Sequence, residues 1–304
     1  MNIFNRKMLA VVGAATMAVA TSPFFASAAQ ASTVGTARVV GIDKTIVRFT
    51  AAAGQANSLT LTISGRTVTL DDKVAIKAGK GCKAVKGDKT KVKCTTSRTP
   101  TELSIMLGDK SDKVYNRTTA PMAADGGSGD DVLSGGSNQD RLSGDTGNDK
   151  LSGNAGDDAI AGEAGDDYLY GGSGKDWLSG GFGYDIVLAG SGDDTVNGGE
   201  DGDDLHGDGG DDTIHGGNGH DAIAGGPGSD RMYGDAGDDG IVGGELDGDV
   251  PDSADYISGG AGDDTLIGQT GNDRMYGGPG DDSLTGGAGK DTLKGGPGVD
   301  RIRQ

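Results

Sequence analysis

Apolar residues recur at every ninth position over the C-terminal part of the chain. Residues 126–303 divide into nineteen units, and all but one of these units are nine residues long. The eighth residue of each unit is aliphatic or Met, whereas positions seven and nine are mostly polar or small. The end of each unit therefore alternates outward, inward and outward, as a strand does. We expect each unit to contain a three-residue strand whose position-eight side chain points into the interior.

The first six residues of each unit are rich in glycine. Glycine occupies position one in nearly every unit and positions two and four in most, as in the first unit, which begins with Gly126-Gly127-Ser128-Gly129. This spacing predicts a tight turn with positive φ angles and close backbone approach. One unit, residues 243–258, is sixteen residues long, and we expect its seven additional residues to form a bulge or loop.

Position six is aspartate in every unit, and these residues are the predicted metal ligands. They are Asp131, Asp140, Asp149, Asp158, Asp167, Asp176, Asp185, Asp194, Asp203, Asp212, Asp221, Asp230, Asp239, Asp255, Asp264, Asp273, Asp282, Asp291 and Asp300. Stacked strands lie about 4.8 Å apart, so carboxylates at the same position of stacked turns repel each other by about 1 kcal/mol per pair in water. A cation is needed to neutralise them. The available ligands are carboxylate and backbone carbonyl oxygens, which favour Ca²⁺ over zinc or copper.

The unit GGxGxDxUx, in which U is aliphatic, resembles the RTX or hemolysin-type calcium-binding nonapeptide. The resemblance covers residues 126–303. It implies an all-β fold, a parallel β-roll with two units per turn, whose two sheets face each other across the position-eight side chains. It also implies multiple Ca²⁺ ions along both edges, at most about 17, each shared between units i and i+2 and held by position-six carboxylates and turn carbonyls.

The N-terminus has the pattern of a secretory signal peptide over residues 1–31. Arg6 and Lys7 precede an apolar stretch at residues 8–20, and small residues before Ser32 offer a cleavage site. The apolar stretch is too short to span a bilayer. We therefore expect a secreted, extracellular protein, free or associated with the cell surface, that does not insert into a membrane.

Residues 32–106 contain few glycines and several alternating runs rich in Thr and Val. The runs at residues 45–51, 58–64 and 101–107 predict strands, and Ser64-Gly65-Arg66 predicts a hairpin turn. We expect a small, antiparallel, β-sandwich-like domain ahead of the roll.

Residues 107–125 are expected to join this domain to the roll. The segment 107–115 has Asp112 and Val114 where positions six and eight would fall. We interpret it as a degenerate repeat that caps the roll, because terminal units of solenoids are usually atypical. The residues after it form a short linker.

Cys82 and Cys94 are the only cysteines. In an exported chain an even number of cysteines predicts a disulfide, worth about 3 kcal/mol for a loop of this length. Five lysines lie between them: Lys83, Lys86, Lys89, Lys91 and Lys93. Two interpretations remain open, a solvated hairpin and a dock for an anionic cell-wall polymer or for the acidic roll of another molecule.

Charge divides sharply between the two parts of the chain. Residues 1–125 hold 18 Lys and Arg against 8 Asp and Glu, whereas residues 126–304 hold 9 against 38. The acidic roll repels nucleic acid and anionic membranes, so neither is an expected partner. Few apolar residues and a high net charge predict a disordered chain until calcium binds.

No catalytic motif occurs in the sequence. The three histidines, His206, His215 and His220, all lie in the repeats, and neither HExxH nor GxSxG is present. A Thr ladder suited to ice binding is also missing, since only Thr146 and Thr270 occupy position three. We expect a non-enzymatic calcium-binding repeat protein. The alternative is a calcium-crosslinked surface adhesin or matrix protein that binds a partner through its N-terminal domain or insertion, or that self-associates.

Overall fold

The computed structural model describes residues 34–244 and 253–304, which form β-strands joined by short turns. The predicted signal peptide and the middle of the long unit lie outside the described residues. No helix long and apolar enough to cross a membrane occurs in these two ranges.

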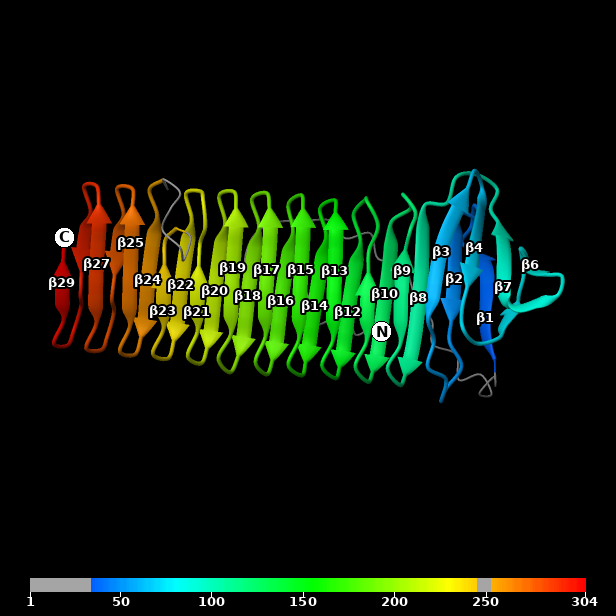
Figure 1. Cartoon of the computed structure of the whole chain (residues 1–304), viewed down its shortest axis with the longest axis horizontal. Helices are drawn as coiled ribbons and strands as arrows, with labels where there is room; N and C mark the ends of the chain where they lie inside the picture. Colours follow the sequence, from blue (N-terminus) through cyan, green and yellow to red (C-terminus); the bar gives the residue numbers. More distant parts are fainter. Residues whose placement is uncertain (1–33, 245–252) are drawn as a thin grey trace. The chain divides into compact units, whose positions relative to one another are not determined.

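The strands form two sheets (Figure 1). The first sheet contains, in spatial order, β28 (Thr292–Lys294), β26 (Arg274–Tyr276), β24 (Tyr256–Ala261), β22 (Arg231–Ala236), β20 (Thr213–Asn218), β18 (Thr195–Glu200), β16 (Trp177–Phe182), β14 (Ala159–Ala164), β12 (Arg141–Thr146), β10 (Met122–Ser128), β8 (Glu102–Asp109), β2 (Ile46–Thr50), β1 (Gly35–Val40) and β5 (Ile76–Ala78). The second contains β29 (Arg301–Arg303), β27 (Ser283–Ala288), β25 (Thr265–Thr270), β23 (Gly240–Val242), β21 (Ala222–Ala224), β19 (Asp204–Gly209), β17 (Ile186–Ser191), β15 (Tyr168–Ser173), β13 (Lys150–Ala155), β11 (Val132–Ser134), β9 (Lys113–Asn116), β3 (Leu59–Ser64), β4 (Thr67–Asp71), β7 (Asp88–Thr95) and β6 (Cys82–Val85).

From β8 to β29 the chain winds as a parallel β-roll. Consecutive strands alternate between the two sheets, and each strand pairs in parallel with the second strand after it. In the pairing of β11 with β13, for example, Leu133 lies opposite Leu151, eighteen residues further on. The predicted all-β roll with two units per turn is confirmed.

Most strands of the roll are six residues long, and the expectation of three-residue strands is wrong for them. In β13 the pairing with β15 runs over residues 150–152, skips position one, and resumes at Asn154 and Ala155. Position two has a positive φ, 73° at Asn154 and 116° at Gly172, so the strand bends there without losing its partner. The turn proper is confined to positions four to six.

The interior of the roll consists of the position-eight side chains of both sheets. They are fully or almost fully buried from Leu133 to Leu284. In the last turn Leu293 is half-buried and Ile302 is exposed. The hydrophobic core continues without interruption into the apolar residues of the N-terminal strands, such as Phe49 and Leu59.

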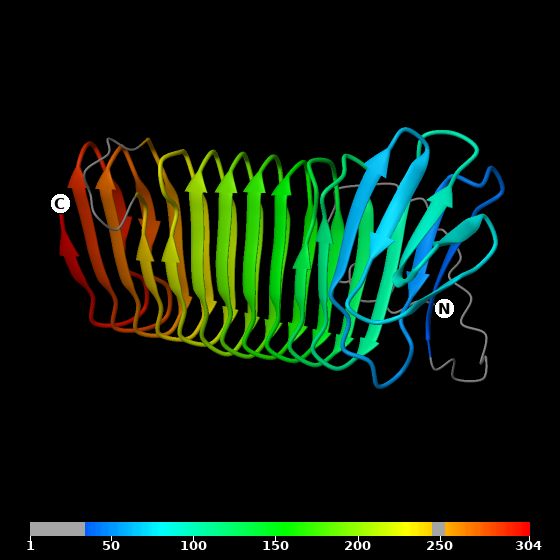
Figure 2. The same cartoon turned by 45° about the vertical axis from the view of Figure 1, so that its right-hand side comes forward.

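The N-terminal strands form an antiparallel region, as predicted, and they extend the same two sheets (Figure 2). The hairpins β1–β2, β3–β4 and β6–β7 are antiparallel, with Gly65 at positive φ in the turn between β3 and β4. β2 and β3 pair in parallel with β8 and β9 of the roll. The predicted disulfide between Cys82 and Cys94 is confirmed and joins β6 to β7. The division into a domain at 32–106 and a cap at 107–125 stays a prediction.

Candidate metal-binding site

The position-six aspartates form two ladders, one for the odd and one for the even units. All of them are buried except Asp291 and Asp300 in the last turn, which are half-buried. Each lies just before the strand that carries the position-eight residue, where the chain leaves the turn and enters the sheet. The nonapeptide period thus places the nineteen predicted ligands in columns.

One oxygen of each carboxylate bonds to the backbone of the preceding turn on the same edge. The N–H of Asp131 donates to Oδ1 of Asp149 at 2.7 Å, and the N–H of Asp149 donates to Oδ1 of Asp167 at the same distance. The pattern repeats along the roll as far as the bond from Asp282 to Asp300, at 3.2 Å. It also crosses the long unit, because the N–H of Asp230 donates to Asp255. Oδ1 therefore ties successive turns together.

The second oxygen, Oδ2, is buried and receives no hydrogen bond in most rungs. This holds at Asp131, Asp149, Asp158, Asp167, Asp176, Asp185, Asp194, Asp203, Asp212, Asp221, Asp239, Asp264 and Asp282. Asp140 differs, because its Oδ2 accepts the N–H of Gly136 at 2.5 Å. A buried carboxylate oxygen without a donor is costly and needs a positive partner.

The glycine at position one makes room for this oxygen. A β-carbon on Gly153 would overlap Asp158 Oδ2 and would lie 2.7 Å from the carbonyl oxygen of Gly171 in the next turn. The same arrangement recurs at Gly126, Gly180 and other position-one glycines. At these positions a carboxylate oxygen and a carbonyl oxygen approach each other closely over a glycine that has no side chain.

Backbone oxygens must supply much of any metal coordination in these ladders. No three side chains of His, Cys, Asp or Glu gather as a metal-binding cluster within the described ranges. A donor set of carboxylate and carbonyl oxygens suits a hard cation such as Ca²⁺. The residues present therefore fit the calcium ion that the sequence predicts.

The protonation of the ladder carboxylates reflects their burial. Burial raises the pKa of Asp131 to about 7 and the pKa values of Asp158 and Asp185 to about 8. The backbone hydrogen bond at Oδ1 lowers each pKa, but the neighbouring carboxylates of the ladder raise it further. Without a cation these groups hold protons near neutral pH.

The sequence analysis missed a second, exposed ladder at position five. Here the N–H of a later turn donates to the side chain of an earlier one, as Asn148 does to Asp130 Oδ1 at 3.1 Å and Tyr184 to Asp166 Oδ1 at 3.1 Å. The hydrogen bonds run in the opposite direction to those of position six. The Asp-Asp doublets of many units were the available signal.

The degenerate repeat contributes a further rung that the predicted ligand set leaves out. Asp112 is buried, its N–H donates to Asp131 Oδ1 at 2.7 Å, and its own Oδ2 is buried without a partner. The ladder therefore begins one turn before the first regular unit. The position of Asp112 in the segment 107–115 was the signal.

The histidines stay outside the ladders of position six. His206 and His215 lie on opposite sheets, in β19 and β20, and pair with Asp204 and Asp235 at 3.0 and 2.9 Å. His220 occupies position five, where its Nδ1 accepts the N–H of Asp238 at 2.8 Å. They do not converge on a common site.

A family model for the RTX calcium-binding nonapeptide repeat matches most of residues 124–302. The matched stretches are residues 124–151, 152–187, 180–214, 188–223, 215–248, 252–284 and 267–302. Together they cover more than half of the chain. No curated protein matches the chain in a sequence search.

Displacing a ladder carboxylate from its position should weaken calcium binding. In Gly153→Ala the new methyl group would crowd Asp158 Oδ2 and the Gly171 carbonyl, so we expect folding to require more calcium and a loss of about 1–3 kcal/mol of stability at fixed calcium. Gly209→Ala is the matched control, because a β-carbon there meets no atom within 4 Å. Calcium titrations followed by circular dichroism compare them, and equal midpoints would contradict the assignment.

The pH dependence of stability should reverse sign when calcium is added. Without calcium, the folded-state pKa values lie above the unfolded value of about 4, so the ladders stabilise the fold at low pH and lose that contribution as pH rises through about 7–8. Calcium requires the ionised carboxylates, so with calcium stability should be lost as pH falls. The folded fraction, measured by circular dichroism at several pH values in chelator and at limiting calcium, gives both slopes. Slopes of the same sign would count against the ladders as the calcium ligands.

Proposed function

Because the chain belongs to the family of RTX calcium-binding nonapeptide repeat proteins, we propose that it is a secreted, non-enzymatic protein whose β-roll folds when multiple Ca²⁺ ions bind. The position-six aspartates, Asp131 to Asp300, would hold the ions together with position-one carbonyl oxygens. The bound ions supply positive charge beside buried carboxylates. The chain itself links each turn to the next, because the backbone N–H of one position-six aspartate donates to Oδ1 of the aspartate in the following turn.

The observation that carries this proposal is the buried, unpartnered Oδ2 at successive rungs. Residues 126–304 hold 38 acidic against 9 basic residues, and the ladders concentrate part of that charge in the fold's interior. A polypeptide of this charge, with one buried apolar side chain per nonapeptide, lacks the hydrophobic content of a self-sufficient fold. Folding would then be coupled to ion binding.

Two features support export. Residues 1–31 have the composition of a signal peptide, and Cys82 and Cys94 are joined in a disulfide, which persists in oxidising compartments. Extracellular modules of this kind bind calcium in about the 0.1–1 mM range, which matches the medium outside a cell. The protein would therefore leave the cell unfolded or partly folded and fold outside it.

The second candidate function is a calcium-crosslinked surface or matrix protein, and the β6–β7 hairpin favours it. Lys83 and Lys93 lie directly opposite each other in the strand register, and both are exposed. Like charges in opposing positions destabilise a hairpin, so an anionic polymer would relieve the repulsion. The ion pairs of Lys91 with Asp71 and Asp88 leave it less available.

Calcium-dependent folding is tested by far-UV circular dichroism combined with sedimentation on the chain without residues 1–31. We expect a coil in chelator and a transition to β-structure in rising calcium, because cations neutralise the ladders. Unchanged mass would support an autonomous module, whereas growth into larger species would favour the crosslinked form. A chain that is fully folded in chelator would contradict the proposal.

The hairpin is tested by co-sedimentation with isolated cell walls of the producing organism. The variant replaces four hairpin lysines by Gln: Lys83, Lys86, Lys89 and Lys93. The control replaces four lysines of the roll: Lys150, Lys175, Lys290 and Lys294. We expect the hairpin variant to lose most of its retention, by about ten-fold or more at low salt, and the control to keep it. Equal retention would reject the hairpin as the binding surface.

A further inference from the structure

The ladder of the odd units continues beyond the repeats into the N-terminal strands. Leu59 of β3 pairs with Val114 of β9 as Val114 pairs with Leu133 of β11. Two residues before Leu59 stands Asn57, whose backbone N–H donates to Asp112 Oδ1, as the aspartates of the roll do to one another. Asn57 thus stands where the next position-six aspartate of this ladder would be, with a side-chain amide in place of a carboxylate.

A second carboxylate reaches this layer from β4. Asp72 follows the last residue of β4, and its Oδ1 accepts the N–H of Ser58 at 2.6 Å and that of Lys73 at 2.7 Å. The consecutive amides of Asn57 and Ser58 therefore donate to two different carboxylates, Asp112 and Asp72. In the repeats the second carboxylate comes from position five of an earlier turn, as Asp130 does for Asn148, whereas Asp72 comes from outside the repeats.

The three side chains are buried, and each has an oxygen without a hydrogen-bond partner. Asn57 and Asp112 are 0 % exposed and Asp72 is 6 % exposed. The partnerless atoms are Asn57 Oδ1, Asp72 Oδ2 and Asp112 Oδ2. The charge of Asp72 is among the causes that raise the pKa of Asp112, after burial, so the two carboxylates are close enough to repel each other.

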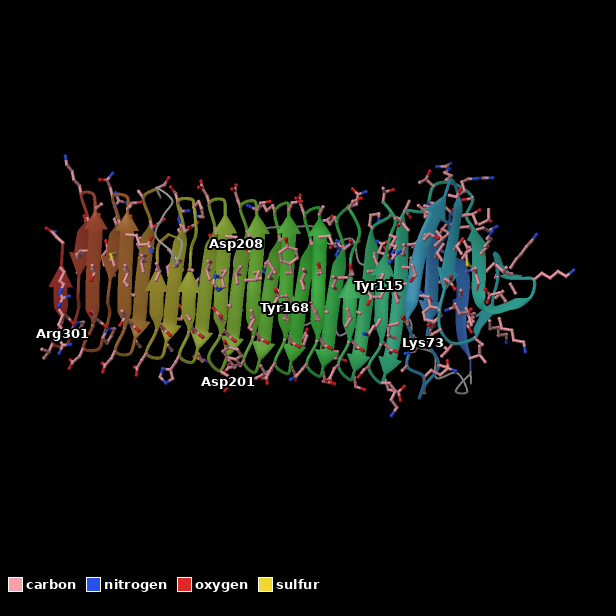
Figure 3. All side chains as sticks on the ribbon, viewed as in Figure 1. Lys73, Tyr115, Tyr168, Asp201, Asp208 and Arg301 are labelled. Atoms are coloured by element: carbon pink, nitrogen blue, oxygen red, sulfur yellow. A yellow bond between two sulfur atoms is a disulfide. The ribbon has the colours of Figure 1, made fainter. Side chains whose placement is uncertain are left out.

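Lys73, the basic residue next to Asp72 in the chain, does not neutralise this cluster by direct contact. Lys73 is exposed, and among the described residues no ion pair joins it to Asp72 or Asp112. Figure 3 shows Lys73 at the end of the roll where the N-terminal strands join it. A water molecule offers two protons to three acceptors and leaves both charges in place, whereas a divalent cation would offset both charges and accepts carboxylate and amide oxygens as ligands.

We propose that Asn57, Asp72 and Asp112 form a calcium site outside the nonapeptide repeats, which fastens the N-terminal strands to the first turn of the roll. Its donors are two carboxylates and one amide oxygen, all of them ligands that calcium accepts. The site goes beyond the proposed function, because the ladders can be filled whether or not this site exists. It would make the N-terminal strands sensitive to calcium although they contain no repeat.

The test compares Asp72→Asn with Asp71→Asn in the chain without residues 1–31. Asp71 is the neighbouring residue, its side chain is 45 % exposed, and it pairs with Lys91 at 2.8 Å, so the same substitution there leaves the cluster intact. Native mass spectrometry at saturating calcium counts bound ions. Hydrogen exchange of the segment 55–74 reports the local effect. We expect Asp72→Asn to bind one calcium fewer and to exchange about ten-fold faster in this segment, with Asp71→Asn unchanged.

A second variant, Asn57→Leu, removes the amide oxygen without adding charge and should also lose one calcium. If the circular dichroism spectrum shows that Asp72→Asn does not fold, the ion count of Asn57→Leu decides the outcome. A full ion count and wild-type exchange in both variants would overturn the proposal and leave a cluster that binds no ion. If the wild-type chain itself binds no calcium, both proposals fail, whereas a full ion count in the two variants overturns only this one, so the two failures are distinguishable.

Discussion

A buried carboxylate oxygen without a proton donor, repeated along both edges of the roll, is the constraint on which the rest of the structure depends. At Asp158, Oδ1 accepts the N–H of Asp140 and is satisfied, but Oδ2 has no donor and lies against Gly153, near the Gly171 carbonyl. Glycine at position one makes room for this close approach in every unit but one, in which Ala189 takes its place. The 18-residue spacing then follows, because each oxygen must meet the same atoms in the turn above.

The interior of the roll is too narrow to offset such a charge by hydrophobic burial. As far as Leu284, each nonapeptide contributes one large apolar side chain to the interior, such as Leu133 or Val187, and the few other buried apolar residues are alanines such as Ala189. Most of the fold is therefore held by backbone hydrogen bonds within the sheets and by the Oδ1 ladder. Both kinds of bond require the turns to stack closely, which brings the carboxylates together. The stacking of the turns and the binding of the cations are therefore coupled in one folding equilibrium.

The repeats made most of the roll predictable from the sequence. A nine-residue period in Asp and in the position-eight residues fixes which side chains point inward and which columns form, and the resemblance to RTX repeats supplied the winding. The length of the strands was not predictable in the same way. Glycine at position two suggests a turn, yet residues such as Gly172 bend the strand and still pair with the next turn.

The N-terminal region was less predictable, because its pairings join distant segments. Alternating residues indicated β2, β3 and β8, but nothing local shows that Leu59 lies beside Val114 or that Asn57 takes a place in the ladder. Asp72 gives no signal in the sequence, since it belongs to no repeat. Such contacts depend on which edges the hairpins meet, and a single sequence does not encode that choice in a readable pattern.

The most direct test of the central claim is the dependence of the free energy of unfolding on calcium concentration, measured by urea denaturation of the chain without residues 1–31. If buried carboxylates require cations, the free energy of unfolding rises steeply with calcium, with a slope that corresponds to the release of several ions per chain. A free energy of unfolding that does not change between chelator and millimolar calcium would contradict the account.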